Sequence, residues 1–195
     1  MGEGTHGTVS SMPSLADELM AASSETAILV EGLVMDATRA LFETYGVKLE
    51  LDGCAVAKTL PSVGVISTIG FSSPALNGSL LLGIPNVVMQ QTLPTPDANL
   101  ADWSGELANQ LLGRLKNKLL PFDVVINLAL PVVVSGDEFH LPARARRLTR
   151  HFSFISEWGR LFVRTEMELR PSLELVRHHM DSSVVGMDEG ELLFF

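Results

Sequence analysis

The sequence predicts an α/β (α+β) domain whose largely antiparallel sheet carries two long helices on one face. Apolar residues recur at three- and four-residue steps in two long segments, which is the pattern of helices packed on a core. Several shorter segments alternate apolar and polar residues and are joined by tight turns, as antiparallel neighbours are. Because helix and strand patterns follow in the same order roughly twice, we expect a pseudo-repeated helix-strand-strand unit.

The individual elements follow from periodicity and from residues that start or stop helices. Gly46 is placed to end the first helix, and the prolines mark further boundaries. We expect a helix from Pro13 or Ser14 through residue 45, followed by strands at 47–52, 63–70 and 76–84, with a turn at 72–74. A short helix should run from Pro85 to about Gln91, and a second long helix from Asp97 or Asn99 to before Pro121. A strand at 124–134 and a hairpin of 151–158 with 160–169 complete the prediction.

The chain is expected to hold one main domain. Residues 1–20 are predicted to be a flexible leader, and residues 21–170 are predicted to form the domain. The first helix is expected to begin in the second half of the leader. Residues 171–195 read as an appended C-terminal tail that ends in two leucines and two phenylalanines. A docking segment and a disordered end are both compatible with that tail.

Composition excludes several classes of protein. A formal charge of −9 and a pI near 4.9 argue against a nucleic-acid partner, which normally meets a basic surface. The apolar stretch at 27–37 is interrupted by Glu31 and Asp36, so no membrane insertion is expected. The single cysteine, Cys54, cannot form an intramolecular disulfide, which favours a cytoplasmic location.

Common catalytic and metal motifs are absent from the sequence. The five histidines show no pair at the helical spacing of a zinc site, and no CxxC motif occurs. No glycine-rich phosphate loop and no GxSxG motif is present either. We therefore expect no metal site and no cofactor bound by this chain.

The second long helix is the most informative segment. Its leucines form an apolar stripe, and its polar side carries Glu106 and Asn109, which are three residues apart and so lie side by side. Gly113 leaves room one turn further on for another molecule. The candidate site comprises Glu106 and Asn109 as catalytic residues, with Asp102, Gly113 and Lys116 as partner-binding residues.

A carboxylate beside a carboxamide suits a reaction that needs little chemical help. Hydrolysis of an activated acyl phosphate mainly requires a water held in line with phosphorus. A carboxamide can hold that water as both donor and acceptor, while a carboxylate can bind a cation of a partner. The alternative is that Glu106 and Asn109 are two polar residues on a solvated helix face.

The wider sequence resembles the CheX/CheC/FliY family of response-regulator phosphatases. The segment from Trp103 to Gly113, with its Gly-Glu-Leu-Ala-Asn core, is similar to the active-site helix of that family. Residues 59–85 resemble its paired strands, residues 124–136 its strand after the active-site helix, and residues 151–169 its final strands. The resemblance covers about residues 25–170 and implies a CheC-like fold.

This resemblance implies a cytoplasmic protein phosphatase that hydrolyses the aspartyl phosphate of a CheY-like receiver in two-component signalling such as chemotaxis. Asn109 would position the attacking water, and Glu106 would pair with the receiver's lysine. Mg²⁺ would be held by the receiver and not by this chain. Members of the CheX type act as homodimers joined through their sheets, so a homodimer through sheet edges is implied.

Departures from the family pattern narrow the prediction. The first helix lacks the second Glu-x-x-Asn motif of CheC-type members, which favours a single-site, CheX-like protein, and Trp103 stands where the family tends to have a smaller residue. A non-catalytic signalling adaptor of the same fold is the main alternative, and an assembly component that docks through its tail is a third. An arginine cluster at 144–150 either steers an acidic receiver or balances local carboxylates.

Overall fold

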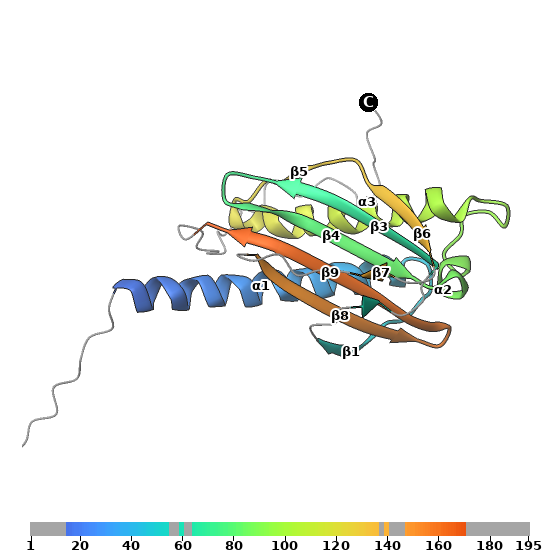
Figure 1. The fold of residues 1–195 in the computed structure, drawn as a ribbon, viewed down its shortest axis with the longest axis horizontal. Coiled ribbons are helices and arrows are strands. Elements are labelled where there is room, and N and C mark those ends of the chain that lie inside the picture. The colour runs from blue at the N-terminus through green and yellow to red at the C-terminus, as the bar shows by residue number, and fades with distance from the viewer. Residues whose placement is uncertain (1–14, 55–58, 61–63, 137–138, 141–146, 171–195) are drawn as a thin grey trace, which may run out of the picture.

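The computed structural model describes residues 15–54, 59–60, 64–136, 139–140 and 147–170. One layer is a curved sheet, and the two long helices lie together on one of its faces (Figure 1). The helices are α1 (Leu15–Glu43), α2 (Asn86–Gln90), α3 (Leu100–Leu119) and the 3-10 turn η1 (Leu120–Phe122). The strands are β1 (Glu50–Cys54), β2 (Thr59–Leu60), β3 (Gly64–Ser72), β4 (Leu76–Ile84), β5 (Asn127–Leu128), β6 (Val132–Gly136), β7 (Phe139–His140), β8 (Leu148–Ser156) and β9 (Gly159–Leu169).

Within the described residues, seven strands form the main sheet in the order β1-β8-β9-β4-β3-β5, and β6 also pairs with β3. Every pairing in this sheet is antiparallel. β2 and β7 form a separate antiparallel pair. The antiparallel sheet with two helices on one face confirms the predicted fold class.

Helix α1 follows from its apolar spacing. Val30, Val34, Ala37 and Leu41 recur at three- and four-residue steps and are fully buried. The helix begins at Leu15, close to the predicted start, and the chain leaves it through Gly46, whose φ of +75° favours glycine. The domain boundaries themselves stay predictions.

The strand predicted at 47–52 is displaced. Val47 and Leu49 are buried as expected, but the ladder to β8 begins only at Glu50, and Leu51 is 40% exposed. The alternation therefore marked Val47 and Leu49 correctly as buried but not Leu51, and it placed the start of the hydrogen-bonded strand too early. Pairing depends on where β8 lies, which local alternation does not encode.

The single strand predicted at 124–134 is wrong. Two short strands, β5 and β6, both pair with β3, at Phe71 and Ser72 for β5 and from Gly64 to Thr68 for β6. Pro131 lies between them and has no N–H to donate to a ladder, so a continuous strand is interrupted there.

The two predicted hairpins are confirmed. Ser73 closes the β3–β4 turn, because its backbone N–H donates to the Leu76 carbonyl at 2.9 Å and its hydroxyl accepts from the Leu76 N–H at 2.8 Å. The β8–β9 turn passes through Gly159, whose φ is +141°. The predicted short helix is present as α2, but it begins at Asn86, with Pro85 as its N-cap rather than in its first turn.

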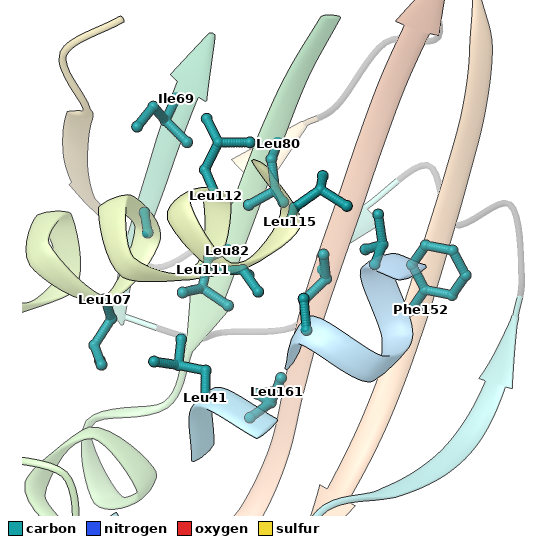
Figure 2. Close-up of a cluster of buried hydrophobic side chains, with 14 of the residues drawn as sticks. Leu41, Ile69, Leu80, Leu82, Leu107, Leu111, Leu112, Leu115, Phe152 and Leu161 are labelled. Atoms are coloured by element: carbon teal, nitrogen blue, oxygen red, sulfur yellow. The ribbon is translucent and has the colours of Figure 1, made fainter. Parts of the chain in front are cut away.

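The main core lies between the helices and the sheet (Figure 2). Its fully buried leucines on α3 face strands β3 and β4, where Ile69, Leu80 and Leu82 point toward them. The predicted stripe of α3 is confirmed as buried: Leu107, Ala108, Leu111, Leu112 and Leu115. This packing fixes which side of α3 is turned outward.

Some predictions fall on residues outside the described ranges. They are the leader at 1–14, the tail at 171–195, and Arg144 and Arg146 of the arginine cluster. Within the cluster, Arg150 Nε lies 2.8 Å from Glu31 Oε1 on α1. For Arg150 the charge-balancing interpretation therefore holds.

Candidate active site on helix α3

Helix α3 carries all five predicted site residues, and its start is well defined. The Asn99 side chain caps the helix, since its Oδ1 accepts from the N–H of Ala101 at 2.9 Å and of Asp102 at 3.2 Å. Asp102 in the first turn and Lys116 in the last turn complement the helix dipole. The sequence thus specifies both the position and the direction of the helix.

The inward side of α3 packs close to the sheet. Ser104 hydrogen-bonds Ser67 of β3, and their hydroxyl oxygens are 2.6 Å apart in a buried contact. A Cβ added to Gly105 would lie 3.2 Å from Val133 Cγ2 on β6. Small residues at these two positions let the helix backbone approach the sheet.

The outward side of α3 holds the predicted site. Asp102 is exposed, and Glu106, Asn109, Gly113 and Lys116 are partly exposed. A Cβ added to Gly113 would meet no atom within 4 Å, so this part of the surface is open. Glu106 and Asn109 are one helical turn apart on the same side.

Glu106 is held by neighbours that sequence reasoning missed. Gln110 Nε2 donates to Glu106 Oε1 at 3.0 Å, and Tyr45 OH donates to Gln110 Oε1 at 2.7 Å. The signal for Gln110 was its i,i+4 spacing from Glu106. Tyr45 follows α1, 65 residues from Gln110, and no local pattern joins the two.

Tyr45 is itself supported by an aromatic neighbour. Its ring meets the edge of the Trp103 ring, with centroids 5.7 Å apart and planes at 84°. Trp103 Nε1 donates to Thr92 Oγ1 at 2.9 Å, and that buried hydroxyl donates to the Met89 carbonyl at 2.7 Å. Trp103 thus links the start of α3 to α2 and to Tyr45, which lies just beyond the end of α1.

Asn109 differs from Glu106 in its surroundings. Its side-chain amide makes no hydrogen bond to another described residue, whereas Glu106 is held by Gln110. An unengaged carboxamide on a partly exposed position keeps its donor and acceptor for a water or a partner.

Among the described residues, no three His, Cys, Asp or Glu side chains gather as metal ligands would.

A shifted histidine lies away from α3. His151 on β8 pairs with Arg164 on β9 and is nearly buried. Burial lowers its pKa from 6.5, the Arg164 charge lowers it further, and the Glu166 carboxylate acts in the opposite direction. His151 alternates with Phe152 of the main core, so it is on the sheet face opposite α3.

A match to a protein-family model identifies the family that the chain resembles. Residues 65–153 match the model of the chemotaxis phosphatase CheX. The chain is therefore similar to the CheX family over a segment that includes all of α3 and with it Glu106 and Asn109. No curated protein sequence matches the chain.

Solved structures share the CheX-like fold. A CheC-like superfamily protein from Shewanella sp. PV-4 has a TM-score of 0.63 at 23% identity, over 71% of this chain and 97% of that one. The chemotaxis protein CheX from Vibrio vulnificus has a TM-score of 0.61 at 21% identity, over 69% and 96%. CheX in a CheX–CheY–BeF₃–Mg²⁺ complex from Borrelia burgdorferi has a TM-score of 0.56 at 12% identity, over 70% and 96%.

These similarities bear on the fold alone, and they agree with the predicted CheC-like architecture. The fold is shared over nearly the whole length of these two solved structures. Across the part of the chain that the structure describes, no helix combines the length and the apolar character needed to cross a bilayer.

Proposed function

We propose that this chain is a CheX-like phosphatase that hydrolyses the aspartyl phosphate of a phosphorylated, CheY-like receiver domain. The observation that carries the proposal is the outward face of α3, where Glu106 and Asn109 stand one turn apart beside the open Gly113. The matched CheX model over residues 65–153 supports it, as does a neighbour of the same fold described in complex with CheY.

Asn109 is proposed to position the water. Its carbonyl oxygen accepts a hydrogen bond from the water, and its NH₂ group donates to an acceptor beside it. The water oxygen attacks phosphorus in line, the bond between phosphorus and the acyl oxygen breaks, and aspartate and inorganic phosphate leave. The proton of the water goes to phosphate or solvent, so no strong base is needed.

Glu106 is proposed to pair with a receiver lysine and so to orient the complex. Its carboxylate is fixed on one oxygen by Gln110, and the other oxygen makes no hydrogen bond within the described residues. Asp102, Gly113 and Lys116 lie along the same face and are proposed to contact the receiver. Any Mg²⁺ belongs to the receiver in this scheme, and we propose that the protein works in the cytoplasm.

A homodimer joined through sheet edges is also proposed. β6 pairs with β3, and Val132 and Val134 of β6 are 57% and 45% exposed. Leu130 next to this strand is 88% exposed. An apolar strand at a sheet edge is suited to pairing with a second copy. Light scattering of Val132→Lys beside the unmodified protein tests this, and an unchanged mass would exclude that edge.

The decisive experiment is the decay of a phosphorylated CheY-like receiver with Mg²⁺, with and without this protein. We expect faster decay that Asn109→Ala slows by roughly a hundred-fold or more in kcat, because the water loses its positioning group. Asn127→Ala is the matched control, since Asn127 is an exposed asparagine on β5, outside the site helix. Its activity should equal that of the unmodified protein.

Other results would reject the proposal. Full activity of Asn109→Ala would exclude the mechanism. Saturable binding of phosphorylated receiver with an unchanged phosphate lifetime would instead establish the non-catalytic adaptor. Circular dichroism of both variants keeps loss of folding separate from loss of chemistry.

A further inference from the structure

The outward face of α3 is connected to the end of α1 by a short series of hydrogen bonds. We infer that Tyr45 and Gln110 are positioning residues that hold the Glu106 carboxylate in the orientation that receives the partner's cation. This inference rests on the proposed function. It concerns two residues that do not themselves touch the reacting atoms.

The direction of each hydrogen bond follows from the chemistry of the groups. An ionised carboxylate can only accept, so the Gln110 group 3.0 Å from Glu106 Oε1 must be the NH₂ end of the amide. The carbonyl end of Gln110 then faces Tyr45, 2.7 Å away, and the phenol must donate to it. Tyr45 therefore selects the amide orientation that is useful to Glu106.

Tyr45 is able to fix this orientation because its own position is constrained. Its backbone N–H donates to the Phe42 carbonyl at 3.0 Å, in the turn that ends at Gly46. Its ring packs on the main core and against Trp103, and Trp103 is tied to Thr92. A rigid donor at the end of this series limits the rotation of the Gln110 amide.

The consequence for Glu106 is a reduced choice of conformations. The terminal torsion of a glutamate is otherwise broad, so a free carboxylate would lose this freedom when it binds a cation. One oxygen of Glu106 is already held by Gln110, and this leaves the second oxygen for the partner. Preorganisation of this kind strengthens binding and leaves the chemical step unchanged.

Two variants remove the hydrogen bonds with little change of shape. Tyr45→Phe deletes only the hydroxyl and keeps the ring against Trp103, and Gln110→Met keeps the length of the side chain. Each should raise KM for the phosphorylated receiver by about three- to ten-fold and leave kcat within about two-fold. Thr44→Val is the matched control, because Thr44 OH donates to the Leu41 carbonyl and not to this series.

Two combined variants test whether the effect passes through Glu106. Tyr45→Phe and Gln110→Met together should raise KM no more than the larger single effect, because they interrupt one series. In a Glu106→Ala background, Tyr45→Phe should have no further effect on kcat/KM. Additive effects, a persisting effect without Glu106, or a fall in kcat at constant KM would overturn the inference.

A measurement independent of activity separates this inference from the proposed function. The ¹⁵N relaxation of the Gln110 side-chain amide should show an ordered group in the unmodified protein and a mobile one in Tyr45→Phe. Exposed Gln90 gives the internal reference for a mobile side chain. If Gln110 is as mobile as Gln90 in the unmodified protein, the inference fails. If instead Asn109→Ala retains full activity, the proposed function fails.

Discussion

The hydroxyls of Ser67 on β3 and Ser104 on α3 form a buried hydrogen bond, with 2.6 Å between their oxygens. This contact lies directly beneath the helix that carries Glu106 and Asn109. A buried hydroxyl that loses its partner keeps the cost of having left water, whereas two apolar groups in its place do not. The hydrogen bond therefore connects α3 to β3, and each serine contributes to stability only while the other hydroxyl is present.

Substitution of one serine should be more damaging than its size suggests. Ser104→Ala or Ser67→Ala alone should lower the free energy of unfolding by about 1–3 kcal/mol, because the remaining hydroxyl is buried without its partner. The double variant should lose less than the sum of the two. Urea denaturation measures all three, and strictly additive losses would contradict this coupling.

Two glycines of α3 should respond in different ways to alanine. Gly113→Ala should raise the free energy of unfolding by about 0.5–1 kcal/mol, since the added Cβ meets nothing within 4 Å and alanine favours the helix. Gly105→Ala should gain less or lose stability, because its Cβ would lie 3.2 Å from Val133. Equal gains at both positions in urea denaturation would refute the close approach of α3 to β6.

The cap of α3 should contribute to the stability of the site helix. Asn99→Ala removes the acceptor for the N–H groups of Ala101 and Asp102 and should cost about 0.5–2 kcal/mol. Asn99→Asp keeps that acceptor and should retain most of the stability. Thermal unfolding of the two variants gives the comparison, and identical midpoints would argue against the cap.

The buried His151 should make stability depend on pH. Its pKa is lowered in the folded protein, mainly by burial and then by Arg164, so the unfolded chain binds the proton first as pH falls. The free energy of unfolding should therefore fall below about pH 6.5, with a contribution of at most about 1.4 kcal/mol per pH unit. Above that pH both states are neutral at this residue, and the contribution should be complete.

Comparison with His151→Gln measures the contribution of His151 to the pH dependence of stability. The variant should show a shallower fall in stability between about pH 7.5 and pH 5.5 than the unmodified protein, when both are measured by urea denaturation. Parallel profiles would mean that His151 is not the group that titrates.

The elements that local pattern encodes were predictable from the sequence. α3 combines a buried leucine stripe with a capping asparagine, and both signals lie within the helix itself. Glu106 and Asn109 could be paired for the same reason, because one helical turn fixes their relation. The β8–β9 hairpin likewise follows from alternation on either side of Gly159.

The features that were missed depend on contacts between distant segments. β5 and β6 are separate because both pair with β3, and residues 124–134 alone show only a β-branched run. The partner of Glu106 was visible as an i,i+4 neighbour, but nothing near Gln110 in sequence indicates Tyr45. Long-range hydrogen bonds of this kind require the fold to be known first.

The pairing of β1 with β8 has a consequence for synthesis on the ribosome. Asp52 and Ser153 in these strands are 101 residues apart, so β1 emerges long before its partner exists. Sheets closed by such distant pairings fold slowly compared with helical proteins. Helix α3, with Glu106 and Asn109, is translated in this interval, after β3 and β4, on which it packs, and before β8 and β9. Each new molecule therefore carries the residues of the site, and the two strands beneath them, before the sheet is complete.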